Sequence, residues 1–169
     1  MPVLETDRLI LSELKPEDGQ FILGLLNDPD FLTHIGDKGV QNLDDAVHYI
    51  ETGPRVNYAD HGHGLYKVSL KDGTPIGICG LLYRDNLDDP DIGFATLPEF
   101  RKNGYTLEAA KAAIKDGFDR FNYKRIVGIT SKENVASIRL LGKLGLFYEK
   151  MVQIDPNGKP IQLYAIHFS

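Results

Sequence analysis

The sequence of 169 residues, with 42% hydrophobic and 25% charged residues, has the length and composition of one water-soluble globular domain, so we expect a single domain over residues 1–169. Its formal net charge of −5 gives no electrostatic reason to expect a nucleic-acid or anionic-membrane partner. No apolar run is long enough to span a bilayer, and the N-terminus does not resemble a signal peptide. The single cysteine, Cys79, cannot form an internal disulfide and is expected to be buried, which favours a cytoplasmic, reducing compartment.

The first third of the chain predicts one strand and two helices. Apolar residues recur through 8–14 in a pattern that indicates a strand. Pro16 then opens a helix with an apolar face, and Asn27-Asp28-Pro29 ends it. Asn42 can cap a second helix, which Gly53-Pro54 closes or kinks.

The remaining residues predict six strands and two helices. A stripe of apolar residues at steps of three and four marks the first of these helices, which follows residue 106. The predicted strands are 65–70, 75–82, 91–97, 125–130, 148–154 and 161–167, and Asn134 begins the second helix. The order βααβββαβαββ predicts an α+β domain with a mixed central sheet of about seven strands flanked by helices.

A short basic loop, Arg101-Lys102-Asn103-Gly104-Tyr105-Thr106, joins a predicted strand to a predicted helix. Phosphate groups bind at such junctions because the first N–H groups of a helix have no internal partner and the helix dipole is positive there. Gly104 would let the backbone approach a phosphate, and Arg101 and Lys102 would add charge. The loop alone is equally compatible with an ordinary strand–helix connection whose basic tip is solvated. No Walker triplet occurs, and no dinucleotide fingerprint is complete.

Further motifs accompany this loop in a fixed order: Thr6-Asp7-Arg8-Leu9-Ile10-Leu11, Asp91-Ile92-Gly93-Phe94, Gly104-Tyr105-Thr106-Leu107-Glu108-Ala109, and the segment from Asn134 to Leu146. They resemble the motifs of the GNAT superfamily of N-acetyltransferases, and in particular the RimJ/RimL-like branch that acetylates ribosomal-protein N-termini. The resemblance covers nearly the whole chain. It is specific for the superfamily but not for a substrate.

The resemblance implies a fold and a coenzyme site. In the family, two central strands splay apart and the pantetheine arm of acetyl-CoA lies between them; here these strands would be 91–97 and 125–130. The residues expected to bind the coenzyme are Thr96, Leu97, Arg101, Lys102, Asn103, Gly104, Tyr105, Thr106, Asn134 and Ser137. The main chain near Thr96 and Leu97 would pair with pantetheine, and Asn134 would either bond its amide or only cap a helix.

The resemblance also implies a reaction in which a primary amine attacks the thioester of acetyl-CoA directly, without a metal. Asp91 is expected to be the general base and Ser137 to contact the thiol, although Asp91 has an alternative role as the polar start of a strand. Leu141 stands where many superfamily members carry a tyrosine proposed to protonate the thiolate, so the identity of the general acid is left open. The segment 60–63 offers two histidines but no third metal ligand, and we expect a flexible loop there, near the substrate, rather than a metal site.

The sequence is therefore compatible with three functions: an acetyltransferase acting on an amine, a catalytically weak CoA-binding sensor or partner module, and a scaffold without a coenzyme. The acceptor amine is a protein N-terminus, an amino acid or a small molecule, and no motif distinguishes them. The sequence is also compatible with either a monomer or a homodimer.

Overall fold

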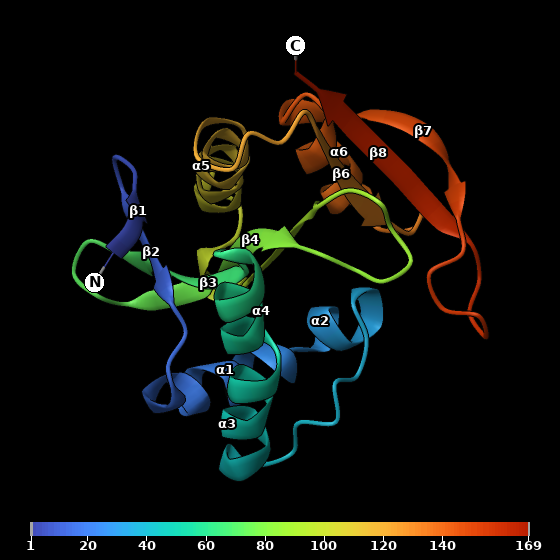
Figure 1. Ribbon diagram of the computed structural model, residues 1–169. Coiled ribbons are helices and arrows are strands. Elements are labelled where there is room, and N and C mark those ends of the chain that lie inside the picture. The colour runs from blue at the N-terminus through green and yellow to red at the C-terminus, as the bar shows by residue number, and fades with distance from the viewer. Residues whose placement is uncertain (1, 169) are drawn as a thin grey trace.

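The computed structural model describes residues 2–168, and its strands form one eight-stranded sheet in the order β1-β2-β3-β4-β5-β6-β8-β7 (Figure 1). Neighbouring strands are antiparallel except for β5 and β6, which are parallel. The strands are β1 (Pro2–Glu5), β2 (Leu9–Glu13), β3 (Leu65–Leu70), β4 (Pro75–Leu82), β5 (Asp91–Thr96), β6 (Arg125–Thr130), β7 (Phe147–Val152) and β8 (Ile161–His167). The expected mixed sheet flanked by helices is confirmed.

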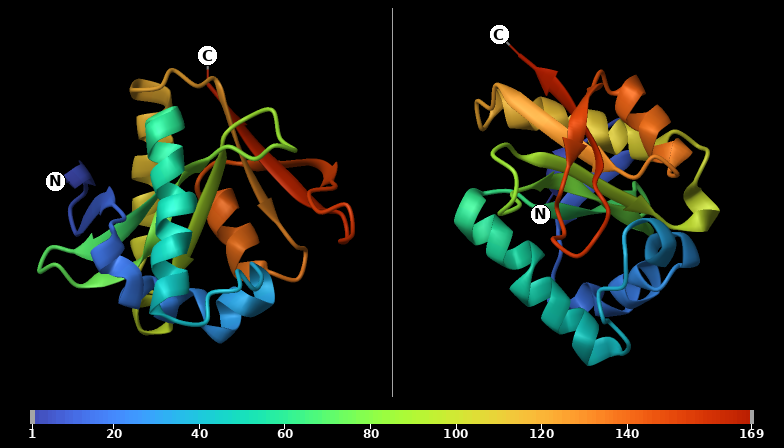
Figure 2. Two further views of the ribbon diagram at one scale, coloured as in Figure 1. Left: turned by 60° about the horizontal axis from the view of Figure 1, so that its bottom comes forward. Right: turned by 90° about the vertical axis from the view of Figure 1, so that its right-hand side faces the viewer.

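Helices cover both faces of this sheet. They are α1 (Gly19–Leu26), α2 (Pro29–His34), α3 (Leu43–Thr52), α4 (Pro54–His61), α5 (Tyr105–Asp119) and α6 (Val135–Lys143), with 3-10 turns at Pro16–Asp18 (η1) and Pro98–Phe100 (η2). Figure 2 shows α5 and α6 on one face and α1 to α4 on the other. Ala110 of α5 and Leu141 of α6 belong to the larger hydrophobic core, whereas Ile22 of α1 and Ile50 of α3 pack with Ile78 of β4 in a second core. No helix within residues 2–168 has the length and apolar character needed to cross a membrane.

The structure contains one more strand than the roughly seven expected, because the N-terminal residues fold back on β2 as the edge strand β1. A turn stabilised by Thr6 makes this possible. The main-chain N–H of Thr6 donates to the carbonyl of Leu9 at 3.0 Å, and the N–H of Leu9 donates to the Thr6 hydroxyl at 3.0 Å. Such a local side-chain bond favours a turn over extended structure, so residues 2–5 pair with β2 as a separate strand that precedes the strand expected over residues 8–14.

Two helices were also missed because a proline that ends one helix can begin the next. Pro29 and Pro54 occupy the first turns of α2 and α4, where the missing N–H of proline costs nothing. The side chain of Asp28 accepts a hydrogen bond from the N–H of Phe31 at 3.3 Å and so caps α2.

The central strands β5 and β6 are paired only at their beginnings. Asp91 is in register with Val127, and the N–H of Val127 donates to the carbonyl of Pro90 at 3.0 Å. No further pair joins the described residues of these two strands, so they part toward Thr96 and Thr130. The expected splayed pair is thereby confirmed, and α5 begins beyond the open end of β5.

Candidate functional site

The loop between β5 and α5 has the backbone conformation of an anion cradle. Lys102 and Gly104 both have positive φ values, 65° and 78°, in the left-handed region that favours glycine. The first helical bond of α5 runs from the N–H of Glu108 to the carbonyl of Gly104, at 3.1 Å. The amides of residues 105–107 therefore have no partner within the helix.

No side chain caps α5, the longest helix, although Asn42 and Asn134 cap α3 and α6. Lys102, Asn103 and Gly104 are exposed. The first turn of α5 thus presents uncapped N–H groups and the positive end of a helix dipole to solvent, which suits a phosphate. Glycine suits position 104 because any other residue would be strained at this positive φ. An added Cβ would also lie 3.3 Å from Nη2 of Arg8.

The N-terminal turn fixes this loop, which sequence reasoning did not anticipate. Nη1 of Arg8 donates to the carbonyl of Asn103 at 2.9 Å, its Nε pairs with Glu108 at 2.7 Å, and its guanidinium lies 4.6 Å from the centre of the Tyr105 ring. Thr6 donates to the same Glu108 carboxylate at 2.5 Å. Burial raises the pKa of Glu108, but the bonds from Thr6 and Arg8 outweigh it and hold that pKa below its usual value. These contacts join residues about 100 positions apart, which no local sequence pattern indicates.

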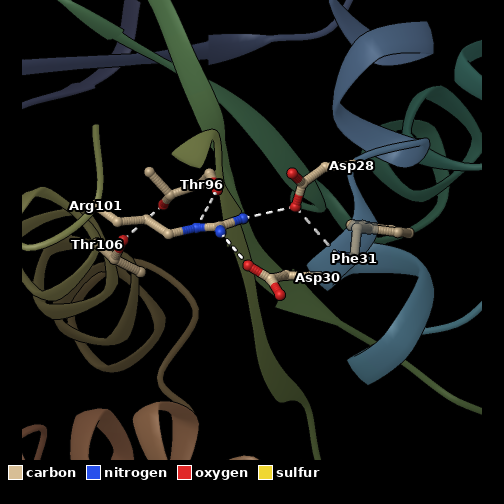
Figure 3. Close-up of polar contacts among 6 residues, drawn as sticks. All are labelled: Asp28, Asp30, Phe31, Thr96, Arg101 and Thr106. Atoms are coloured by element: carbon tan, nitrogen blue, oxygen red, sulfur yellow. Dashed lines mark hydrogen bonds and ion pairs between the residues drawn. The ribbon is translucent and has the colours of Figure 1, made fainter. Parts of the chain in front are cut away.

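The Arg101 side chain extends toward Asp28 and Asp30 (Figure 3). Its Nε donates to the carbonyl of Thr96 at 2.9 Å, its Nη2 to Asp28 at 2.7 Å and its Nη1 to Asp30 at 2.5 Å. The Thr96 and Thr106 hydroxyls share a hydrogen bond of 2.6 Å. The structure therefore brings together three of the expected coenzyme-binding residues and connects them to α2.

The main chain of β5 offers hydrogen-bonding groups to the gap beside it. The N–H of Leu97 donates to the carbonyl of Ile76 on β4 at 2.8 Å. Because successive residues of a strand direct their main-chain groups to opposite sides, those of Phe94 and Thr96 point away from β4 and toward the gap. Thr96, rather than Leu97, is thus the residue whose N–H is available on that side.

Asp91 lies at the closed end of the same gap and is only 1% exposed. Its Oδ2 accepts a hydrogen bond from Nε of Arg84 at 3.0 Å, whereas its Oδ1 is buried without a partner in the described structure. Burial raises the pKa of Asp91, and the charge and hydrogen bond of Arg84 partly oppose that effect. A buried carboxyl group with one free oxygen and a raised pKa can act as a proton acceptor near neutral pH.

The start of α6 carries the other expected residues. The side chain of Asn134 accepts a hydrogen bond from the N–H of Ser137 at 3.2 Å, so Asn134 caps the helix. The Ser137 side chain is partly exposed, and no hydrogen bond joins it to Asp91 within residues 2–168. Leu141, one turn further on, is 1% exposed, and a Cβ added to Gly128 of β6 would lie 2.7 Å from its side chain. The side chain at the position where many superfamily members carry a tyrosine is therefore an apolar core residue.

The segment 60–63 forms the exposed end of a helix followed by one buried histidine, so the expectation of a flexible loop was wrong. The α4 helix ends at His61, and Gly62 caps it with a φ of 81°. His63 is 2% exposed, and both of its ring nitrogens have partners: Nδ1 lies 2.8 Å from the carbonyl of Leu81 and Nε2 lies 2.6 Å from the hydroxyl of Tyr123. In the part of the chain that the structure describes, no three His, Cys, Asp or Glu side chains are grouped to hold a metal ion.

Comparison with known proteins identifies the family. Residues 8–146 match the model of the acetyltransferase (GNAT) domain. The uncharacterized N-acetyltransferase YoaA of Bacillus subtilis (strain 168) is 28% identical over 165 residues, which cover 94% of this chain and 92% of YoaA. The acetyltransferase from Agrobacterium tumefaciens str. C58 has a TM-score of 0.84 at 24% identity, covering 99% of this chain and 95% of its own.

A third protein, RimL, shares the fold at lower identity. It is a ribosomal L7/L12 α-N-protein acetyltransferase whose structure was solved in complex with coenzyme A. Its TM-score is 0.83 at 13% identity, covering 99% of this chain and 98% of RimL. Because the family model spans well over half of the sequence and the solved acetyltransferases share the whole fold, this chain belongs to the GNAT acetyltransferase family.

Proposed function

We propose that residues 1–169 form a single acyltransferase domain that transfers an acetyl group from acetyl-CoA to a primary amine. The observation that carries this proposal is the cradle at the start of α5, where two left-handed residues precede a helix that no side chain caps. Gly104 leaves the cradle open for the diphosphate of the coenzyme, and the amides of Tyr105 and Thr106 would bind it. RimL, which shares the fold, binds coenzyme A, which supports this choice of ligand.

The gap between β5 and β6 would hold the pantetheine arm of the coenzyme. Thr96 lies at the loop and Asp91 lies five residues away at the closed end, roughly 16 Å along the strand at the usual rise per residue. A ligand that touches both ends must be extended, as a pantetheine arm is. The main-chain groups of Phe94 and Thr96 would pair with this arm as an added strand would. Acetyl-CoA supplies the thioester, and no metal is part of the proposal.

The chain's own residues would then guide the amine. The Oδ1 atom of Asp91 would accept a proton from the amine, directly or through a water molecule, because it is buried and has no other partner. A main-chain N–H of β5 would polarise the thioester carbonyl. The new C–N bond forms as the C–S bond breaks, and the departing thiolate takes up a proton. We propose that Ser137 contacts this thiol, since Leu141 cannot donate a hydrogen bond.

The acceptor would be a protein N-terminus, an amino acid or a small-molecule amine, encountered in the cytoplasm, where an isolated cysteine stays reduced. The test is to mix the protein with acetyl-CoA and a panel of peptides, amino acids, polyamines and amino sugars, and to follow CoA release with a thiol reagent. We expect release that depends on one class of amine. Calorimetric binding of CoA without release for any amine would instead favour a sensor or partner module.

A further inference from the structure

Arg101 joins three parts of the molecule that are distant in sequence. Its guanidinium bonds the carbonyl of Thr96 at the end of β5 and the carboxylates of Asp28 and Asp30 at the start of α2 (Figure 3). Arg101 is therefore not free to meet a phosphate with its side chain. It instead connects the loop that begins α5 to a helix on the opposite face of the sheet.

Helix α2 has few other anchors. It is six residues long, and Phe31 is its only buried residue. Leu32 and Ile35 at its end are 39% and 47% exposed. A helix this short is not stable by itself and depends on tertiary contacts for its position. The ion pairs with Arg101 thus act together with the buried Phe31 side chain to hold α2 in place.

The contact at Asp28 is the stronger of the two. The Asp28 side chain is 6% exposed, whereas that of Asp30 is 63% exposed. Oδ2 of Asp28 accepts hydrogen bonds from both Arg101 and the N–H of Phe31. A buried carboxylate needs a cation nearby, and breaking such a pair leaves the charge uncompensated. Any shift of Arg101 therefore changes the capping residue of α2 as well.

The other end of the Arg101 contact reaches the proposed coenzyme site. Arg101 bonds the carbonyl of Thr96, the residue whose N–H faces the gap beside β5, and the Thr96 hydroxyl is bonded to that of Thr106 in the first turn of α5. The diphosphate would bind the amides of this turn, and pantetheine would pair with Thr96. The diphosphate and the pantetheine arm of the bound coenzyme would thus both act on Thr96 itself or on residues that Arg101 or Thr96 contacts.

We infer that Arg101 is a positioning residue that couples occupancy of the coenzyme loop to the placement of α2. This inference rests on the proposed coenzyme site. Bound coenzyme fixes Thr96 and the start of α5, Arg101 is held in the conformation that bonds Asp28, and α2 is held in turn. A ligand shifts a conformational equilibrium only through such differential contacts, and the resulting coupling is reciprocal. An ordered α2 then favours coenzyme binding to the same extent.

Hydrogen exchange of the α2 amides measures this coupling without knowledge of the acceptor. The N–H groups of Leu32 and Ile35 bond the carbonyls of Asp28 and Phe31 at 3.0 and 2.8 Å, and they exchange when α2 opens. We expect saturating coenzyme A to slow their exchange by about fivefold or more in the wild-type protein. In Arg101→Gln, coenzyme A should still bind through the loop amides, but the exchange at α2 should change by less than about twofold.

Two further variants make the result specific. Asp28→Asn keeps an oxygen that can cap α2 but removes the ion pair, and it should decouple α2 even if Arg101→Gln folds poorly. Arg120→Gln removes an arginine paired with Asp116 at 2.8 Å at the far end of α5, and it should respond to coenzyme A as the wild-type protein does.

Each outcome decides one question. Binding of coenzyme A by calorimetry with no change in α2 exchange overturns the coupling and leaves the proposed function intact. A full response in both Arg101→Gln and Asp28→Asn overturns the role of Arg101. Absence of coenzyme A binding to the folded wild-type protein contradicts the proposed function itself, on which the inference depends.

Discussion

Replacing Gly104 by alanine tests the coenzyme cradle with the smallest change the chain allows. Gly104 has a φ of 78°, and an L-residue in the left-handed region costs about 1 kcal/mol. The added Cβ would lie 3.3 Å from Nη2 of Arg8, the flexible end of a side chain that can move. We expect the loop to relieve only part of this strain by rotating its amides, which turns one N–H group away from the diphosphate. Losing one hydrogen bond to a charged oxygen costs about 1.5–3 kcal/mol, so the dissociation constant for coenzyme A should rise roughly 10- to 150-fold.

Gly73 provides the matched control. It has a φ of 94° in the turn between β3 and β4, and an added Cβ would meet nothing within 4 Å. Gly73→Ala and Gly104→Ala should therefore each lower the free energy of unfolding in urea by about 1 kcal/mol. Only Gly104→Ala should weaken coenzyme A binding in calorimetry at fixed ionic strength. Wild-type affinity in a Gly104→Ala protein that shows the expected loss of stability would refute the cradle.

Three buried titratable groups, Asp91, His63 and Cys79, can be tested separately. Burial raises the pKa of Asp91, and the charge of Arg84 lowers it, so the variant Arg84→Gln should have a still higher Asp91 pKa. The rising limb of its rate–pH profile should therefore move to higher pH, and an unmoved limb would count against Asp91 as the base. Burial lowers the pKa of His63, so the folded state binds fewer protons than the unfolded chain near its unfolded pKa. The free energy of unfolding should fall between about pH 7.5 and about pH 5.5, less so in His63→Gln, as urea titrations would measure. Burial raises the pKa of Cys79 to about 12, so thiol reagents should not label the native protein rapidly, and Cys79→Ala should keep its transferase activity.

Local patterns were sufficient to predict most of the fold. Apolar periodicity indicated seven of the eight strands and the helix after residue 106, and Asn134 caps α6, which was one of the two roles expected for it. The patterns failed where one residue type serves two purposes. The sequence pattern predicts helix ends at Pro29 and Pro54, although each proline begins a new helix. A proline removes one N–H in either case, and only the tertiary structure decides which helix it belongs to.

The site was predictable as a backbone feature but not as a set of side-chain contacts. Gly104 before an expected helix indicated the loop, because its requirement for positive φ is local. The direction of the Arg101 side chain was not predictable, since its partner Asp28 is 73 residues away. The burial of His63 depends likewise on Tyr123, which is 60 residues away. Such pairings are set by the fold as a whole.

Backbone amide NMR during a titration with coenzyme A would test the central claim most directly. We expect the amide signals of Lys102, Gly104, Tyr105 and Thr106 to shift together and to saturate at one ligand per chain. Binding that leaves these amides unchanged and perturbs another part of the sheet would show that the diphosphate lies elsewhere, and would contradict phosphate binding at the start of α5.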